Sequence, residues 1–285
     1  MVYVGTLAES NRGDAMVWLR ILMLIQLAAV GGCSTVPSTF HPNPAIPSRT
    51  FSHHLWDQVL RAHVADGQVN YQGMAKDKRF AEYLTDLNHV DPNALPTRAD
   101  RLAFWINAYN AFAVKGIIDG YSPRSLWGRY RFFIARDYRV GGETINLYDL
   151  ERSLLIPDFK EPRIHFAIVC ASASCPKLRS SAYVGEELDR QLDEAAREFI
   201  NDPAKNRFDR DNHVARLSMI FNWFTHDFAA HSGSLMQYVK RYLNDPALVH
   251  EMEQTPYTIE FLDYDWSLNG TPPRSADDDR PAGRT

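Results

Sequence analysis

Residues 98–119, with the sequence RADRLAFWINAYNAFAVKGIID, limit the folds open to this chain more than any other segment does. A helix drawn through them carries apolar side chains on nearly every side, and such a helix must be buried all round. We therefore expect it at the centre of the core. Asn107 and Asn110 lie one turn apart in this apolar setting. Burying an amide without a partner costs on the order of a few kcal/mol, so either a structural hydrogen-bond network or a reactive group or ligand must satisfy them.

Helical spacing of apolar residues recurs along the chain. Helices are predicted over residues 51–64, 78–89, 147–155, 185–201, 219–231 and 234–243. Short extended pieces are predicted over residues 67–71, 163–170 and 257–268, with a hairpin over 208–217. Helices therefore dominate, and the predicted fold class is α+β, a helix-rich single domain packed around a small β-sheet.

Residues 163–170, RIHFAIVC, form the clearest predicted strand, because both faces are mainly apolar, as in a strand covered on two sides. Such a strand would separate His165 from Cys170 by roughly 16 Å and point them to opposite faces. A nucleophile and its base need hydrogen-bond reach, so these two are not expected to form a dyad. We expect His165 to lie next to the polar edge of the central helix or next to Glu151. The alternative is that His165 is a buried histidine with a structural role only.

Residues 17–32 are the one segment of the sequence that is apolar enough to enter a lipid bilayer. Sixteen residues fall short of the roughly 20 that a membrane span needs, but they are typical of the apolar region of a secretory signal. The run ends in Val30-Gly31-Gly32-Cys33, which resembles a bacterial lipoprotein box. That resemblance implies that Cys33 carries palmitate or a similar acyl chain and becomes the mature N-terminus. An uncleaved anchor or a plain signal peptide is the alternative.

The location of the protein is predicted from the same region. Arg20 supplies the positive charge of a signal if translation starts at Met16, so we interpret residues 1–15 as an over-extended start. Ser34 rather than an aspartate follows the cysteine, which by the usual sorting rule favours the outer membrane, facing the periplasm. The chain is thus divided into a signal peptide (1–32), a lipidated Pro-rich spacer (33–49), a globular domain (50–270) and a disordered tail (271–285).

Composition and motifs exclude several classes of function. The formal net charge of -4 gives no reason to expect nucleic acid. The sequence has no glycine-rich phosphate loop, no nucleophile-elbow motif and no aspartate cluster with metal-loop spacing. Two cysteines and one histidine on a strand do not make a zinc pattern. We therefore expect no cofactor and no metal, and a membrane as partner through the N-terminal lipid.

The cysteine count is informative. Acylation of Cys33 would leave Cys170 and Cys175 as an even pair in an oxidising compartment. These two are close enough in sequence to form a disulfide if the loop between them curls back. A catalytic thiolate at Cys170, a metal site and unpaired inert thiols are the alternatives.

Two segments, LAFWINAYNAF at 102–112 and RIHFAIVCAS at 163–172, are similar to the two signatures of the domain-of-unknown-function 547 family. Supporting matches lie at residues 147–151, 220–228 and 264–269, so the resemblance extends over nearly all of the folded part. It implies no established activity or cofactor. In that family the cysteine at the position of Cys170 is a more regular feature than the one at Cys175. Arg152 stands where the family often has histidine, and any role of that histidine is in doubt in this chain.

Two functional hypotheses remain. In the first, Cys170, His165, Asn107 and Glu151 form a catalytic pocket of thiol-dependent hydrolase or acyl-transfer type. Glu151 has a simpler explanation as well, because a carboxylate in the first turns of a helix complements its dipole. In the second, the protein is a non-enzymatic envelope module that binds a partner protein or a cell-wall component, and its polar network is only structural. Asn110 and Arg163 are expected to be structural polar residues under either hypothesis.

Overall fold

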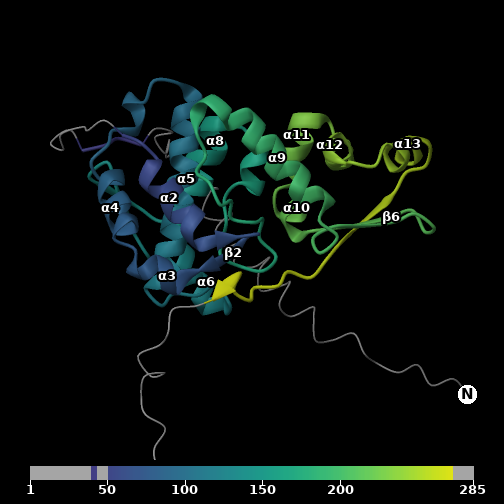
Figure 1. Cartoon of the computed structure of the whole chain (residues 1–285). Helices are drawn as coiled ribbons and strands as arrows, with labels where there is room; N and C mark the ends of the chain where they lie inside the picture. The colour runs from purple at the N-terminus through teal and green to yellow at the C-terminus, as the bar shows by residue number, and fades with distance from the viewer. Residues whose placement is uncertain (1–39, 44–50, 272–285) are drawn as a thin grey trace, which may run out of the picture. The chain divides into compact units, whose positions relative to one another are not determined.

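The computed structural model describes residues 40–43 and 51–271 (Figure 1). All of them lie in one compact unit, Ser38–Thr285. Four predicted features fall outside the described residues, wholly or for the most part: the signal peptide, the lipidation at Cys33, the spacer and the tail. No helix in the described part of the chain is long and apolar enough to cross a membrane. The α+β fold class is confirmed, because helices alternate with eight short strands in three small sheets.

Helix α5 (Arg98–Ile118) lies at the centre of the first hydrophobic core, as predicted. Every residue from Leu102 to Val114 is buried. The helix begins at a capping box, in which the Thr97 hydroxyl accepts from the Asp100 N–H and the Asp100 carboxylate accepts from the Thr97 N–H. An all-round apolar surface thus produces an all-round buried helix.

Shorter elements surround α5 and build the first core with it. They are α2 (His54–His63), α3 (Tyr71–Lys76), α4 (Lys78–Leu87), η1 (Pro92–Ala94), α6 (Leu126–Phe133), α7 (Leu147–Asp149), the π-helix η2 (Leu150–Leu155), α8 (Ile156–Phe159) and η4 (Gly185–Glu187). The predicted helix over residues 147–155 is therefore present as α7 and η2. The Asn146 side chain caps it by accepting from the Asp149 N–H.

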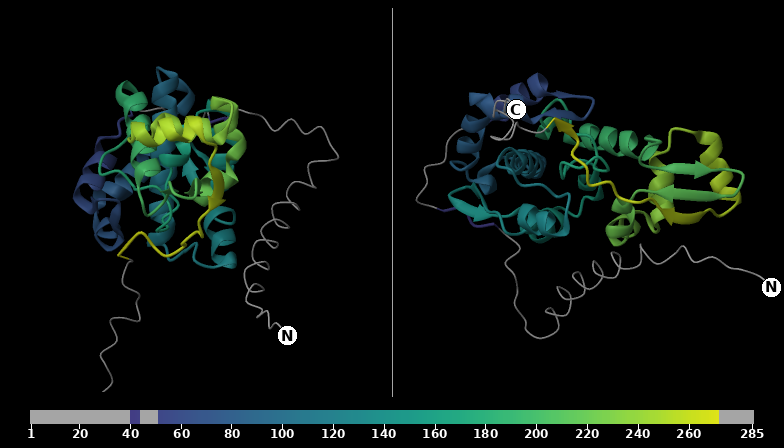
Figure 2. Two further views of the ribbon diagram at one scale, coloured as in Figure 1. Left: turned by 90° about the vertical axis from the view of Figure 1, so that its right-hand side faces the viewer. Right: turned by 90° about the horizontal axis from the view of Figure 1, so that it is seen from below.

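A second hydrophobic core is built from the last third of the chain. Its elements are α9 (Leu188–Asn201), α10 (Met219–Trp223), α11 (Thr225–Ser232), α12 (Leu235–Tyr242), α13 (Pro246–Gln254) and the sheet of β5 (Arg207–Asp209), β6 (Val214–Leu217) and β7 (Thr258–Phe261). Figure 2 shows this sheet beside α13. Phe166 reaches into this core, where its ring lies 5.1 to 5.7 Å from those of Phe199, Phe221 and Phe228.

The remaining strands form two small sheets. Strand β2 (Gln68–Asn70) pairs with β1 (Val64–Ala65) and, in parallel, with β8 (Gly270–Thr271). A Cβ at Gly270 would come within 2.1 Å of the Val69 carbonyl oxygen, so this approach of two backbones requires glycine. Strands β3 (Tyr138–Val140) and β4 (Glu143–Ile145) form a hairpin that the sequence analysis did not predict.

The prediction of a strand over residues 163–170 is wrong. Pro162–Phe166 form a 3-10 helix, η3, which Glu161 caps by accepting from the Arg163 N–H, and residues 167–170 belong to no strand. The segment is buried on both sides, as the pattern indicated. Its backbone, however, is hydrogen-bonded to a side chain instead of to a neighbouring strand. Asn110 of α5 donates to the Ala167 carbonyl and accepts from the Val169 N–H.

Two further predictions need correction. The strand predicted over 257–268 is only four residues long, β7, and continues as an irregular segment. The helix predicted over 219–231 is divided at Phe224 into α10 and α11. The hairpin predicted over 208–217 and the helices predicted near 51–64, 78–89, 185–201 and 234–243 are confirmed to within a few residues.

Candidate functional site

The two asparagines of α5 are both engaged by backbone. Asn107 donates its amide N–H to the Tyr183 carbonyl at 2.8 Å and accepts from the Tyr183 N–H at 3.0 Å. Asn110 holds the segment after η3 with its bonds to Ala167 and Val169, at 2.9 and 2.8 Å. Each amide therefore supplies hydrogen bonds to the backbone of an irregular buried segment, whose N–H and C=O groups would otherwise lack partners. Neither amide is hydrogen-bonded to Cys170, His165 or Glu151, the other members of the predicted catalytic set.

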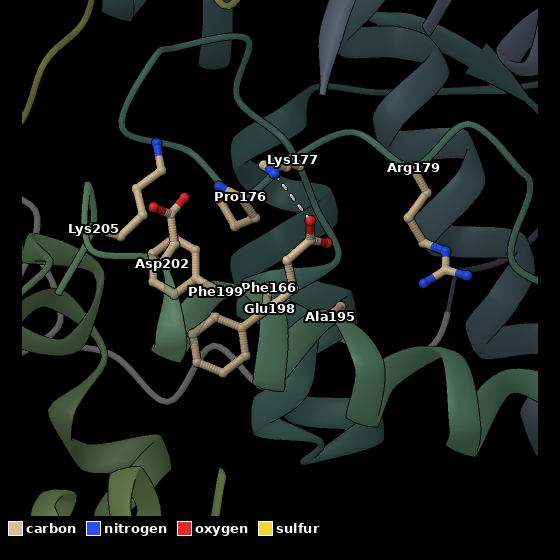
Figure 3. A pocket seen from close by; sticks show the side chains of 9 residues that line it. All are labelled: Phe166, Pro176, Lys177, Arg179, Ala195, Glu198, Phe199, Asp202 and Lys205. Atoms are coloured by element: carbon tan, nitrogen blue, oxygen red, sulfur yellow. Dashed lines mark ion pairs between the residues drawn. The ribbon is translucent and has the colours of Figure 1, made fainter. Parts of the chain in front are cut away.

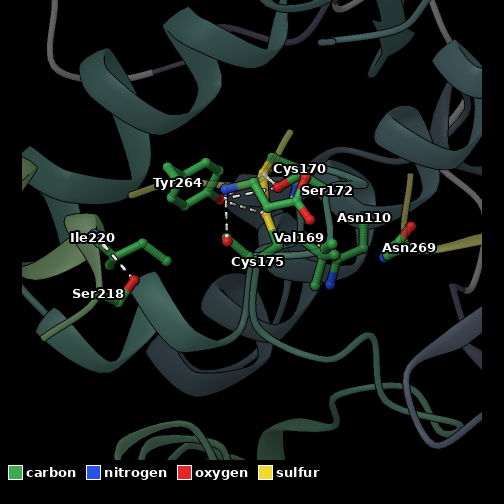
Figure 4. The surroundings of a disulfide bond; sticks show 12 residues. Asn110, Val169, Cys170, Ser172, Cys175, Ser218, Ile220, Tyr264 and Asn269 are labelled. Atoms are coloured by element: carbon green, nitrogen blue, oxygen red, sulfur yellow. Dashed lines mark hydrogen bonds between the residues drawn. A yellow bond between two sulfur atoms is a disulfide. The ribbon is translucent and has the colours of Figure 1, made fainter. Parts of the chain in front are cut away.

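Cys170 and Cys175 are joined in a disulfide (Figure 4). This was one of the alternatives predicted for the pair. Cys170 is partly exposed and Cys175 is buried. The loop that they close adopts a left-handed backbone at Ala171, where φ is 62°. Cys170 therefore has no free thiolate in this structure.

The disulfide loop holds the segment that follows β7. Ala173 and Ser174 donate their backbone N–H groups to the carbonyls of Ser267 and Asp265, at 2.7 and 3.1 Å. In this segment the Tyr264 hydroxyl lies 3.2 Å from each sulfur of the disulfide (Figure 4). Burial raises the pKa of Tyr264, so the phenol stays protonated and donates to sulfur.

His165 lies on η3 and is paired with a residue that the sequence analysis missed. Its Nε2 is 2.9 Å from Oδ2 of Asp227, in α11, and its ring stacks on Phe224 with the centroids 3.7 Å apart. The hydrogen bond from His165 holds the pKa of Asp227 below its usual range. An ionised carboxylate accepts hydrogen bonds only, so Nε2 carries the proton of this bond. The His165 side chain is 1% exposed and that of Asp227 is 26% exposed.

Glu151 lies on the π-helix η2, where it faces a tyrosine instead of His165. The Tyr109 hydroxyl donates to Glu151 Oε2 at 3.4 Å. Arg152 lies 3.8 Å from Glu151, and its guanidinium lies 4.3 Å from the centroid of the Phe224 ring. Arg152 therefore connects Glu151 with the face of Phe224, whose ring also stacks on His165.

Three aromatic rings gather beside this polar group, and we call them the aromatic face: Trp223, Tyr264 and Trp266. Their centroids are 4.6 to 6.0 Å apart. Trp223 is 37% exposed, and the guanidinium of Arg129 lies 4.5 Å from the centroid of the Trp266 ring. These tryptophans lie in segments that carried the family resemblance, but nothing in their spacing indicated that they meet.

Arg163 joins η3 to α9. Its guanidinium contacts Glu161, Asp189 and Asp193 at 2.7 to 2.8 Å, and its side chain is 15% exposed. It contacts neither the disulfide nor the aromatic face.

A small hollow lies between the disulfide loop and α9 (Figure 3). Its rim includes Lys177, Glu198 and Lys205, of which the first two form an ion pair at 3.2 Å. The free space is about 10 Å³, roughly what one water molecule needs. This hollow is therefore too small for an organic ligand.

Part of the chain matches a known family. Residues 92–200 match the family described as "Protein of unknown function, DUF547". This DUF547 region includes α5, Glu151, His165 and the disulfide, whereas Asp227 and the aromatic face lie beyond it. No curated protein and no solved structure matched the chain. Within residues 40–43 and 51–271, no three His, Cys, Asp or Glu side chains are grouped so that they could hold a metal ion.

Proposed function

We propose that this chain is an exported, lipid-anchored cell-envelope protein whose aromatic face binds a saccharide of the cell wall. Export and anchoring are inferred from the lipoprotein-box resemblance at Cys33. Binding is supported by one observation above all: Trp223, Tyr264 and Trp266 lie side by side, and the Arg129 guanidinium lies against the Trp266 ring. The proposal develops the envelope-binding alternative of the sequence analysis.

The chemistry of the aromatic face suits a sugar ring. A pyranose has one apolar face of C–H groups that packs on aromatic rings, and hydroxyls at its edge that need polar partners. Two charged groups act on these rings: Arg129 lies 4.5 Å from the centroid of the Trp266 ring, and the charge of Glu151 adds to burial in raising the pKa of Tyr264. Glu151 and Asp227 are 15% and 26% exposed, so both reach solvent.

A thiol-dependent hydrolase or acyl-transfer activity is the second candidate. It requires that the disulfide be reduced first, since only a thiolate is nucleophilic. The Tyr264 hydroxyl, 3.2 Å from both sulfurs, could then donate a hydrogen bond to the Cys170 thiolate. His165 offers less support, because no hydrogen bond joins it to Cys170 within the described residues: its Nε2 is held by Asp227 and its Nδ1 is buried without a partner.

The saccharide proposal is tested by binding to glycan fragments released from bacterial cell wall, measured by calorimetry. We expect Trp223→Ala and Trp266→Ala each to weaken binding by about tenfold, because each removes a stacking surface worth about 1 to 2 kcal/mol. Trp127→Ala is the matched control, since Trp127 is exposed but lies outside the aromatic face. Equal affinity in the parent and the Trp223 variant, or no binding by the parent, would overturn the proposal.

The second candidate is tested separately. Reduced protein is assayed for hydrolysis and acyl transfer with thioester and amide substrates, and Cys170→Ser is compared with Cys175→Ser. A thiol-dependent enzyme would lose its activity in the Cys170 variant and keep it in the Cys175 variant. Activity that survives in both variants, or that is absent from the reduced parent, contradicts it.

A further inference from the structure

Helix α6, labelled in Figure 1, exposes large apolar side chains to solvent. Trp127 is 65% exposed, Tyr130 45% and Leu126 39%. The rings of Trp127 and Tyr130 stack on each other with centroids 5.2 Å apart. These three account for half of the six large hydrophobic residues that are exposed among the described residues. The apolar surface is therefore concentrated on one helix.

The opposite side of α6 fixes it to the core. Phe132 is fully buried, and it packs so closely on α5 that a Cβ at Gly116 would come within 2.9 Å of its ring. Ser125 caps the helix by accepting from the Gly128 N–H at 3.0 Å. Because the helix is anchored and capped, Trp127 and Tyr130 are held outward by the fold.

Arginines accompany these rings. Residues 120–139 contain five arginines and a single acidic residue, Asp137, in a chain whose net charge is -4. Arg124 and Arg131 are exposed. The nearby Asp119 is already paired with Lys115 and Arg136. Asp265, from the segment after β7, lies within electrostatic range of Arg124. With five arginines in residues 120–139, the segment around α6 still carries an excess of positive charge as well as apolar side chains.

We infer that α6 is a membrane-contact surface that binds anionic lipid headgroups. Tryptophan and tyrosine place an apolar ring among acyl chains and a polar edge among headgroups. Arginine forms bidentate hydrogen bonds with phosphate. A short amphipathic helix that carries both kinds of residue lies in the plane of the bilayer interface and does not cross it.

The N-terminal region favours a membrane over other anionic partners. Phe40 and Asn43 already contact the domain, at Trp105 and Gly141. The proposed lipid on Cys33 would therefore keep the domain within roughly 20 Å of the bilayer, at about 3.1 Å per residue of the chain up to Phe40. A second contact at the interface strengthens attachment, since one signal alone anchors weakly. A nucleic acid or another polyanion would use the arginines but would not account for the outward rings of Trp127 and Tyr130. The inference is independent of saccharide binding at the aromatic face.

The test uses the compact unit Ser38–Thr285, which lacks Cys33 and the apolar run, so that only the domain contacts the vesicles. Sedimentation is measured with vesicles of phosphatidylcholine alone and with added phosphatidylglycerol. We expect binding to the anionic vesicles only. Binding should fall about tenfold or more in Arg124→Glu/Arg131→Glu, because each arginine near an anionic surface contributes to it additively. Trp127→Ala/Tyr130→Ala should weaken binding to a similar extent.

Two matched controls keep the result specific. Phe261→Ala removes an exposed ring on β7, and Arg207→Glu reverses an exposed charge on β5. Neither control should alter sedimentation with vesicles. Circular dichroism checks that each variant is folded. If Trp127→Ala/Tyr130→Ala does not fold, Tyr130→Ala alone is used in its place. The inference is overturned if the parent does not bind anionic vesicles, or if the controls lose as much binding as the α6 variants. It is also overturned if the domain binds heparin and duplex DNA as well as it binds vesicles, and if this binding depends on the arginines but not on Trp127 and Tyr130.

Discussion

His165 Nε2 lies 2.9 Å from Asp227 Oδ2, and this pair joins η3 to α11 across 62 residues of sequence. It connects the segment that carries the disulfide with the helix that follows Trp223. The histidine is buried and its ring also stacks on Phe224, whereas the carboxylate of Asp227 is partly exposed. We therefore expect the stability of the fold to depend on the charge of Asp227.

Asp227→Asn should lower the free energy of unfolding by about 1 kcal/mol at neutral pH, because the neutral amide oxygen accepts a weaker hydrogen bond from His165 than the carboxylate does. The native pKa of Asp227 is depressed, chiefly by its hydrogen bond from His165. Its contribution is thus present above the unfolded pKa of about 3.9 and is lost as the pH falls through the native pKa. Urea unfolding at several pH values measures this.

The control for this experiment is Asp211→Asn, at an exposed turn. The difference between parent and Asp227→Asn should shrink below about pH 4, whereas Asp211→Asn should stay close to the parent throughout. A difference that is the same at every pH would contradict the role of the Asp227 charge.

Asn110→Leu should destabilise the fold by about 2 to 5 kcal/mol, because it leaves the buried Ala167 carbonyl and Val169 N–H without partners. Hydrogen exchange at the Val169 N–H should accelerate more than at the Tyr183 N–H, which Asn107 holds. Asn222→Leu, at an exposed position, is the control. Unchanged exchange at Val169 would show that Asn110 does not hold this segment.

Removal of the disulfide should cost about 2 kcal/mol, since the loop that it closes is short. The effect should be local: in Cys170→Ser/Cys175→Ser, hydrogen exchange should rise at Ala173, Ser174 and Asn269, whose N–H groups tie the loop to the segment after β7. Mass spectrometry after alkylation under non-reducing conditions should find no free thiol at Cys170 or Cys175. Two labelled thiols would refute the pairing.

Arg163→Met should lower stability by about 1 to 3 kcal/mol, because the guanidinium is 15% exposed and contacts Glu161, Asp189 and Asp193. Arg190→Met provides the comparison: Arg190 is 57% exposed, and exposed ion pairs contribute only about 0 to 1 kcal/mol. Thermal unfolding of both variants decides the matter. If the two variants shift the melting temperature equally, Arg163 has no special structural role.

The predictions from sequence succeeded where local pattern decides structure. Helix α5 follows from its all-round apolar surface, and the cap at Asn146 follows from a side chain that accepts from the backbone three residues on. They failed where a distant side chain replaces a backbone partner. Residues 163–170 have the burial of a covered strand, but Asn110 supplies the hydrogen bonds of a neighbouring strand from 59 residues away.

The candidate site was predicted only in part. A disulfide between Cys170 and Cys175 was one of the alternatives that their closeness in sequence allowed. Asp227 was not expected beside His165, and Tyr264 was not expected beside the sulfurs. Helix α6 was also missed. An apolar run with Trp127 and Tyr130 has the pattern of a core helix, and only the packing of Phe132 shows which side faces solvent.

By itself, the sequence determined the central helix and the α+β class, because these depend on neighbouring residues and on side-chain periodicity. For Cys170 and Cys175 it offered a disulfide as one of several alternatives. Only the tertiary structure decided that η3 is not a strand, that His165 meets Asp227, and that Trp223, Tyr264 and Trp266 form one face. Such contacts join residues far apart in the chain. Their geometry is set by how two hydrophobic cores pack together, and no local pattern encodes that packing.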